Sequence, residues 1–357
     1  MSNKKTYTNY PKKVGNEYYK NVREEIAEYF SKITEVVSVY EYGSVKAPGI
    51  SDLDLILVFN DSCNEVDQNL LNLENIGKNA HDLVVDGTVI KMPESIFNQI
   101  LFFDDLKFSK IYGKDIEYIE PSETERYYIS LVSLIDWLPE RILRIKSIFH
   151  SEGININNAL CVLNSYCYSL IFLNNLIGKS LDSVKIINET NLLRSKWYSL
   201  KNPELRIYNL LRDSIKVGYK RINDYKYFLI SSGNYLKSNP IISQETGIEL
   251  HSGMSIKFIS DNEQSNKVEN SNANYINISS YFYSHFMKLA DANGLLSDAI
   301  KNKIDPFIHL NSNFNQQYLQ ALNKKIFLAN KNAEFLNKAG LSNGLIRYGF
   351  HFKQQGL

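Results

Sequence analysis

The sequence is poor in cysteine, since its 357 residues include only Cys63, Cys161 and Cys167. An odd number of cysteines without a metal-like spacing excludes a disulfide framework and favours a reducing compartment. The six histidines form no cluster with one another or with cysteine, so no zinc site is indicated. The sequence therefore predicts neither disulfides nor zinc as stabilising elements.

Excess charge of one sign is also missing, because 40 Lys and Arg residues against 39 Asp and Glu residues leave a net charge of +1. A surface that binds nucleic acid backbones carries a clear basic excess, so the composition argues against a nucleic acid partner. Any polyanion that the protein binds must be held locally.

Long uninterrupted apolar runs are absent as well. The longest apolar stretch, residues 160–177, is broken by Asn164, Ser165, Asn174 and Asn175, whereas a membrane-spanning helix needs ~20 consecutive apolar residues. The N-terminal segment is polar and basic, without the apolar stretch of a secretory signal. We therefore expect a cytoplasmic protein without a membrane partner.

The chain does have enough apolar material for a sizeable core, because 44% of its residues are hydrophobic and 22% are charged. Its length fits two domains of ordinary size. In the first third of the chain, helical and strand-like patterns follow one another. The expected elements are a helix at 16–33, strands at 36–45 and 53–59, a polar helix near 64–78, a strand-like run at 81–92, a helix at 93–105 and a short irregular segment at 111–119.

Beyond residue 120 the pattern becomes helical. Ser122 and Glu125 form a capping box, which predicts a helix start near residue 123, and helical periodicity continues to about residue 236. The later segments are a possible strand pair at 248–260, a polar loop at 261–274 and helices at 291–304 and 314–339. We expect an α+β protein whose N-terminal domain, 1–120, has a mixed β-sheet flanked by helices. The domain at 121–357 is expected to be mostly helical, with a polar loop or hairpin near 240–280.

One segment combines two features that suit phosphate chemistry. Gly43-Ser44 follows an apolar strand, where a glycine lets phosphate approach the backbone and a serine hydroxyl can bind its oxygens. After a spacer of seven residues, Asp52 and Asp54 open the next strand. Residues at i and i+2 of a strand project from one face, ~7 Å apart, a separation that suits a pair of Mg²⁺ ions acting on a phosphoryl group. The leucines that alternate with these aspartates are expected to face the core.

This pattern, GSVKAPGISDLDLILVF, resembles the catalytic motif of the DNA polymerase β-like nucleotidyltransferase superfamily, and the resemblance covers roughly residues 16–120. It implies transfer of a nucleoside monophosphate from an NTP to an acceptor, with Mg²⁺ and release of pyrophosphate. It also implies that Gly43 and Ser44 hold the triphosphate and that Asp52 and Asp54 bind two Mg²⁺ ions, or Mn²⁺ in their place. Members of this superfamily often carry a helical companion domain, which fits the expected helical part of the chain.

The superfamily's third carboxylate, which completes one metal site and helps to activate the acceptor, comes from a later strand. Two residues could supply it here, Asp82 and Asp86. We favour Asp86, because an aspartate that enters an apolar strand ending in a proline turn resembles the arrangement in nucleotide-second-messenger synthases of this superfamily. If Asp86 lies in a hairpin turn instead, Asp82 takes the role.

We therefore expect an enzyme that transfers a nucleoside monophosphate to a hydroxyl of a small molecule, a glycan or a protein that the sequence does not identify. Two alternatives stay open. One is synthesis of cyclic or short oligonucleotide second messengers, and the other is a non-catalytic nucleotide-binding module. Basic residues of the helical part could contact the triphosphate, and the sequence does not choose among them. They are Arg141, Arg144, Lys146, Lys179, Lys196 and Arg212.

Overall fold

The structure is a computed structural model of the α+β class, with a mixed sheet and a helical C-terminal part, as the sequence predicts. It describes residues 5–83, 89–103, 107–233, 247–249, 255–259, 275–282, 285–286 and 315–341. The chain divides into two compact units. The sheet unit comprises Lys12–Ile129 and Ala321–Arg347, and the helical unit comprises Met1–Pro11, Ser130–Gln320 and Tyr348–Leu357.

The sheet unit is built on four strands in the order β4-β3-β2-β5. Strand β2 is antiparallel to both β3 and β5, whereas β3 and β4 are parallel, so the sheet is mixed. The elements of this unit, in chain order, are α1 (Asn16–Phe30), β2 (Val36–Tyr42), β3 (Asp54–Phe59), 3₁₀ turns at Gln68–Leu71 and Leu73–Asn75, α2 (Lys78–Leu83), β4 (Ile90–Pro93), α3 (Glu94–Phe97), a 3₁₀ turn at Ile100–Phe102 and β5 (Phe108–Gly113). Helices α4 (Glu123–His150) and α10 (Gln316–Lys338) each contribute residues to both units.

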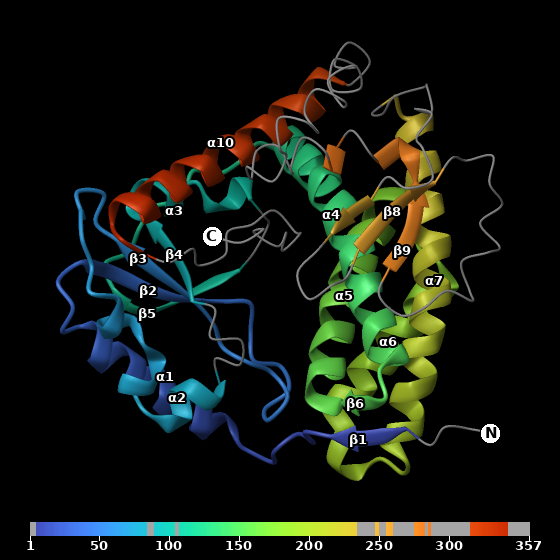
Figure 1. Cartoon of the computed structure of the whole chain (residues 1–357), viewed down its shortest axis with the longest axis horizontal. Coiled ribbons are helices and arrows are strands. Elements are labelled where there is room, and N and C mark those ends of the chain that lie inside the picture. Colours follow the sequence, from blue (N-terminus) through green and yellow to red (C-terminus); the bar gives the residue numbers. More distant parts are fainter. Residues whose placement is uncertain are drawn as a thin grey trace. The chain divides into compact units, whose positions relative to one another are not determined.

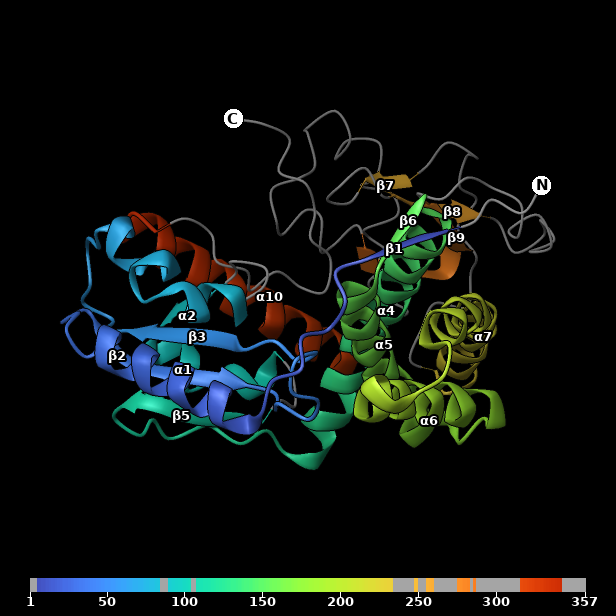
Figure 2. The same ribbon diagram turned by 90° about the horizontal axis from the view of Figure 1, so that it is seen from below.

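Helix α1 lies along one face of this sheet (Figures 1 and 2). Its buried residues recur at helical spacing, as the sequence predicts, and they pack in one core cluster with alternate residues of β3. The buried residues of α1 are Tyr19, Val22, Ile26 and Phe30, and those of β3 are Leu55, Leu57 and Phe59. Because successive side chains of a strand point to opposite faces, the remaining residues of β3, Asp54 among them, belong to the other face.

Helix α3 and the segment after β5 cover that other face. The ring of Phe97 lies 4.4 Å from the ring of Tyr40 on β2. The Tyr40 hydroxyl donates to the carbonyl of Lys114 at 3.3 Å and accepts the N–H of Ile116 at 3.2 Å. A buried tyrosine hydroxyl needs such partners, so these two bonds fix the segment after β5 against the sheet.

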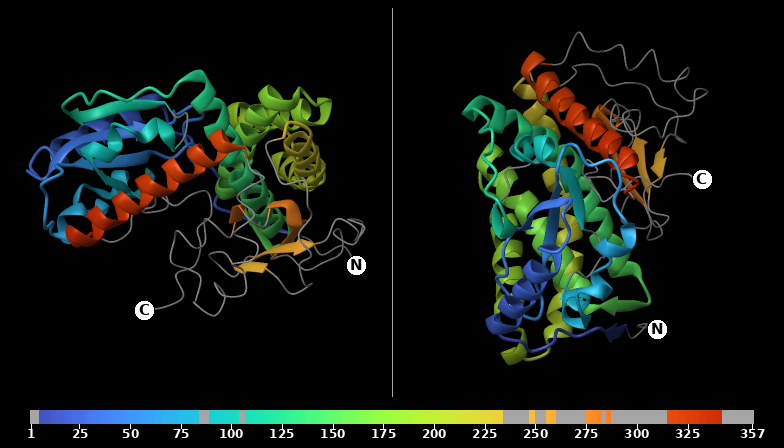
Figure 3. Two further views of the ribbon diagram at one scale, coloured as in Figure 1. Left: turned by 90° about the horizontal axis from the view of Figure 1, so that it is seen from above. Right: turned by 90° about the vertical axis from the view of Figure 1, so that its left-hand side faces the viewer.

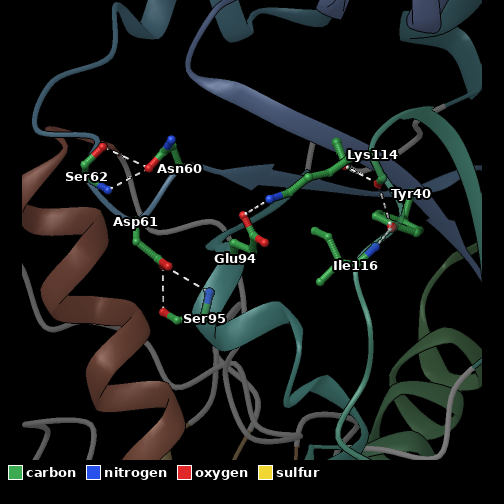
Figure 4. Close-up of polar contacts among 9 residues, drawn as sticks. Tyr40, Asn60, Asp61, Ser62, Glu94, Ser95, Lys114 and Ile116 are labelled. Atoms are coloured by element: carbon green, nitrogen blue, oxygen red, sulfur yellow. Dashed lines mark hydrogen bonds and ion pairs between the residues drawn. The ribbon is translucent and has the colours of Figure 1, made fainter.

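Polar contacts also hold α3 at the end of β3 that is remote from Asp54 (Figure 4). The Asp61 carboxylate accepts both the N–H and the hydroxyl of Ser95, at 3.0 and 2.7 Å, and thereby satisfies a free N–H at the start of α3. The Lys114 ammonium pairs with Glu94 at 2.6 Å. These contacts are structural, since they lie away from the Gly-Ser and Asp-x-Asp segment.

Two predictions of local structure in this unit are wrong. The segment near 64–78 forms 3₁₀ turns instead of a helix, because the side chains of Asp67 and Asn72 accept backbone N–H groups and compete with helical bonding. The run at 81–92 was expected to be strand-like, but its first residues, 81–83, belong to α2. Within the described part of the run, the strand β4 covers Ile90–Pro93, and residues 84–88 lie outside the described residues.

The segment predicted as irregular at 111–119 contains the end of an edge strand. Strand β5 pairs with β2 from Phe108 to Gly113, with a register shift beside Tyr40. The strand has no clean alternation of polar and apolar residues, since Ser109 and Lys110 are adjacent and both exposed. The strand was missed because pairing with β2, a long-range contact, determines its conformation.

The C-terminal helix was expected in the helical domain, yet most of α10 packs in the sheet unit. The side-chain amide of Asn332 donates to the carbonyl of Lys91 on the edge strand β4, at 3.1 Å. The rings of Phe335 and Phe59 lie 6.2 Å apart, and Leu336 joins the same core cluster. The sheet unit therefore uses chain from both ends of the sequence.

In the part of the helical unit that the structure describes, four long helices lie side by side (Figure 3), as the periodicity of 123–236 predicts. They are α4, α5 (Ile156–Ile177), α6 (Leu181–Lys196) and α7 (Pro203–Ser231). The Tyr225 hydroxyl of α7 donates to the carbonyl of Leu131 in α4 at 2.6 Å. A Cβ at Gly218 would lie 2.5 Å from Ile142, so this glycine permits close approach of α7 and α4.

Short strands complete the helical unit. Strand β1 (Thr6–Thr8) pairs in parallel with β6 (Gly153–Asn155), so the N-terminal segment belongs to this unit and not to the sheet unit. Strand β8 (Ser255–Ile259) pairs with β7 (Gly247–Glu249) and β9 (Tyr275–Ser279), and the β7-β8 pair agrees with the predicted strands. The predicted polar loop at 261–274 and the predicted helix at 291–304 lie outside the described residues.

By length and hydropathy alone, one described helix, α5, could cross a membrane. Half of its most apolar window is buried inside the protein, where Tyr166 and Leu170 are fully enclosed. Helix α5 also holds Cys161, which is half-buried, and Cys167, whose thiol pKa burial raises to about 11. The apolar character of α5 therefore has an explanation in packing.

The capping box at the start of α4 is present as predicted, and it gives a first test of the fold. The Ser122 N–H and hydroxyl both donate to the Glu125 carboxylate at 2.8 Å, and the Glu125 N–H donates to the Ser122 hydroxyl at 3.2 Å. We expect Ser122→Ala to lower the free energy of unfolding by ~1 kcal/mol, measured by urea titration. The exposed neighbour Thr124→Ala serves as the control and should change stability much less.

The same box predicts a pH dependence. Hydrogen bonds from Ser122 lower the pKa of Glu125 below its ordinary value of 4.5. A carboxyl group whose pKa is lower in the folded than in the unfolded protein stabilises the fold at pH values above its unfolded pKa. This contribution is lost as the pH falls through the folded pKa. The stability difference between the wild type and Ser122→Ala should therefore shrink below about pH 4.5, and a difference that grew in acid would contradict the box.

Candidate active site

The Gly-Ser pair lies where the sequence predicts, directly after β2. Tyr42, the last residue of β2, is paired with Asp54, the first residue of β3. Gly43 has φ +85, a conformation that favours glycine, and a Cβ there would meet nothing within 4 Å. Its N–H donates to the carbonyl of Lys107 at 2.9 Å. Gly43 and Ser44 are both exposed, so this turn presents backbone and hydroxyl to solvent.

The two aspartates were both expected to open the strand, but only Asp54 belongs to β3, and Asp52 lies two residues before it. Burial alternates along the segment, since Leu53 and Leu55 are buried whereas Asp52 and Asp54 are partly exposed. Since β2 and β3 are antiparallel neighbours, the last residue of β2 and the first residue of β3 lie side by side, at the same end of these two strands. The structure therefore brings together Gly43, Ser44, Asp52 and Asp54, which come from two segments of the sequence.

The third carboxylate has two candidates, and the structure describes the backbone of one. Asp82 lies in the last turn of α2, a helix and not the predicted strand. The next residue, Leu83, accepts the N–H of Leu53 through its carbonyl at 3.1 Å, so this end of α2 lies beside the aspartate pair. Asp86, the favoured candidate, lies outside the described residues.

A compact turn separates the Gly-Ser pair from the aspartates. The carbonyl of Ala47 accepts the N–H groups of Ile50 and Ser51 at 3.0 and 2.8 Å. The Ser51 hydroxyl accepts the N–H of Ala47 at 3.2 Å, which closes the turn from its other side. Gly49 has φ +84 within this turn. We refer to residues 47–51 as the spacer turn.

Two side chains of α1 reach the two segments of the site. The Tyr19 hydroxyl contacts the spacer turn, donating to the carbonyl of Ser51 at 2.6 Å and accepting the N–H of Gly49 at 2.9 Å. The Arg23 guanidinium makes two hydrogen bonds to Glu41, at 2.6 and 3.0 Å, one residue before the end of β2. Hydrogen bonding to Glu41 raises the pKa of Arg23. Sequence reasoning missed both contacts, although a tyrosine on a buried helix face was a signal that its hydroxyl needs a partner.

The residues present suit a divalent cation of the Mg²⁺ type. Asp52 and Asp54 offer hard carboxylate oxygens on one exposed edge, which Mg²⁺ prefers, and the rest of its shell is ordinarily water and substrate phosphate. Among the residues that the structure describes, no three His, Cys, Asp or Glu side chains gather into a metal-binding group. A site formed by Asp52 and Asp54 would thus depend on a third ligand from the chain, the substrate or water.

Four of the basic residues considered for the triphosphate have partners within the helical unit. Arg141 lies over the ring of Trp137 at 4.3 Å and donates to Ser169, while Lys146 donates to the carbonyl of Tyr275. The other two are engaged with carboxylates. Arg144 pairs with Glu140, and Arg212 pairs with Asp213. Each of the four is therefore engaged in a contact within the helical unit.

Comparisons with protein-family models, with curated proteins and with solved structures found no match to this chain.

Proposed function

We propose that the protein is a Mg²⁺-dependent nucleotidyltransferase that moves a nucleoside monophosphate from an NTP to an acceptor hydroxyl. One observation carries this proposal. The register of β2 and β3 sets the Gly43-Ser44 turn and the Asp52/Asp54 pair at the same sheet edge. An exposed Gly-Ser turn beside two carboxylates suits metal-assisted phosphoryl chemistry. The resemblance of the motif to polymerase β-like enzymes points the same way.

In the proposed reaction the acceptor oxygen attacks the α-phosphorus of the NTP. The bond from the α-phosphorus to the bridging oxygen breaks, pyrophosphate leaves, and the hydroxyl proton passes to a carboxylate base. The N–H and the hydroxyl of Ser44, next to Gly43, would bind triphosphate oxygens. Asp52 and Asp54 would hold two Mg²⁺ ions, which when bound neutralise charge on the attacking and leaving oxygens. The third carboxylate, from Asp86 or Asp82, would serve as the base.

The acceptor is proposed to be a small molecule, a glycan or a protein. A net charge of +1 offers little electrostatic attraction for a nucleic acid backbone. The metal ions would supply positive charge at the site, and this charge does not enter a count of residues.

The proposal is tested by following two radioactive labels in each NTP, one on the α-phosphate and one on the γ-phosphate. The full-length protein is incubated with Mg²⁺, with or without candidate hydroxyl acceptors. We expect the α-label to enter a product and the γ-label to leave as pyrophosphate, both only with Mg²⁺. An oligonucleotide product formed without any acceptor would identify a second-messenger synthase. Transfer of the γ-label to a product, or no Mg²⁺-dependent turnover with any NTP and acceptor, would contradict the proposal.

A further inference from the structure

Tyr19 is enclosed in the core of the sheet unit but ends in a polar contact with the spacer turn. The side chain is 1% exposed. Its hydroxyl lies 2.6 Å from the Ser51 carbonyl oxygen and 2.9 Å from the Gly49 nitrogen, so it acts as donor and acceptor at once. The two bonded groups belong to the last residues before Asp52. Helix α1 is thus bonded directly to the turn from which the aspartate pair emerges.

A second contact from α1 lies one helical turn further on. Arg23, four residues after Tyr19, binds Glu41 through two parallel hydrogen bonds, and Glu41 is 4% exposed. Residues four apart lie on the same helix face, so the two side chains point to the sheet together. One of them holds the strand that leads into Gly43, and the other holds the turn that leads into Asp52. The helix therefore contacts both segments that form the candidate site.

The position of Tyr19 separates it from the chemistry. Tyr19 belongs to the core cluster that contains Leu53 and Leu55, whereas Asp52 and Asp54 alternate with these leucines and face the other way. Its hydroxyl contacts two backbone groups of the spacer turn, the Ser51 carbonyl and the Gly49 N–H. Through these two bonds Tyr19 can influence a bound metal or nucleotide by way of the backbone of the spacer turn.

We propose that Tyr19 is a positioning residue for metal binding in the nucleotidyl transfer. Its hydroxyl fixes the conformation of the spacer turn and thereby sets the orientation of the Asp52 and Asp54 side chains that follow this turn. This inference rests on the proposed function. The hydrogen bonds restrict the peptide planes at Gly49 and Ser51, and ligating carboxylates must be held within about 0.5 Å of their productive geometry. Loss of the hydroxyl leaves the ring in the core and removes this restriction.

The test compares Tyr19→Phe with Tyr18→Phe. The control is matched, because Tyr18 is adjacent on α1, belongs to the same residue type and donates to exposed Asn79 at 3.2 Å, away from the turn. For Tyr19→Phe we expect the Mg²⁺ concentration that gives half-maximal turnover to rise roughly tenfold, the factor that corresponds to loss of about one net hydrogen bond. Amide hydrogen exchange at Gly49 should accelerate in the same variant. Tyr18→Phe should change neither quantity.

The outcomes separate this inference from the proposed function. If the wild type turns over and Tyr19→Phe keeps the same Mg²⁺ dependence, Tyr19 has no positioning role and the nucleotidyltransferase proposal stands. If Tyr19→Phe loses turnover equally at all Mg²⁺ concentrations, its effect is on general folding, and the inference is also overturned. If the wild type shows no Mg²⁺-dependent turnover while exchange at Gly49 still accelerates in Tyr19→Phe, the contact is structural, and both the inference and the function fail.

Discussion

Replacing Asp52 and Asp54 together by alanine should reduce Mg²⁺-dependent NTP turnover by roughly 10³-fold or more, since metal-ion stabilisation of the transition state contributes several kcal/mol and each ~1.4 kcal/mol is a factor of ten. Asp54 begins β3 and Asp52 lies two residues before it, and both side chains are partly exposed, whereas their leucine neighbours make the core contacts. The fold should therefore survive the double substitution. Turnover is measured by pyrophosphate release, and folding by circular dichroism and thermal unfolding.

Asp61→Ala provides a matched control for the loss of a carboxylate. Asp61 lies just beyond the other end of β3, where it accepts two hydrogen bonds from Ser95 (Figure 4). Its removal should lower stability by ~1 kcal/mol, the typical cost of a lost helix cap, and leave turnover unchanged. A folded Asp52/Asp54 double variant with wild-type turnover would show that these aspartates do not carry the reaction.

Gly113→Ala should produce a large loss of stability. Gly113 has φ +90, and a Cβ there would lie 2.1 Å from the carbonyl oxygen of Val37 and 2.7 Å from the Cα of Ser38. Both atoms belong to the backbone of the central strand β2, so they cannot move without disturbing the pairing of β2 with β5. Because backbone strain and overpacking both apply, we expect the free energy of unfolding to fall by roughly 3 kcal/mol or more, as measured by urea unfolding.

Gly340→Ala distinguishes the two contributions. Gly340 also has a positive φ, +67, and belongs to the sheet unit, but a Cβ there would meet nothing within 4 Å. Only the conformational strain applies, so we expect a loss of ~1–2 kcal/mol. If both variants lost stability equally, the close approach of β5 to β2 at Gly113 would be wrong.

The parts of the fold that the sequence predicted are those that local pattern determines. The alternation from Ser51 to Leu55 predicted that Leu53 and Leu55 are buried, and the S-x-x-E pattern located the start of α4 to within a residue. In both cases the residues that decide the structure are neighbours in sequence. Local hydrogen bonds and the period of burial are then sufficient.

The parts that were missed depend on contacts between distant segments. Strand β5 gains its conformation from β2, and α10 packs on Phe59 and the edge strand β4 across more than half the chain. Thr6–Thr8 pairs with β6 in the helical unit by the same kind of long-range bond. The residue pattern within each of these segments does not indicate which distant segment it will contact. The contact of Tyr19 with the spacer turn belongs to the same class, because sequence shows that the hydroxyl needs a partner but not which one.

The most direct test of the central claim is a crystal structure of the full-length protein with Mg²⁺ and a non-hydrolysable NTP analogue. We predict metal ions bound to the carboxylates of Asp52 and Asp54, with the triphosphate at Gly43 and Ser44. The same map would show whether Asp82 or Asp86 supplies a third ligand. A nucleotide bound elsewhere, or a triphosphate at this edge with no metal on either aspartate, would contradict the proposed nucleotidyltransferase site.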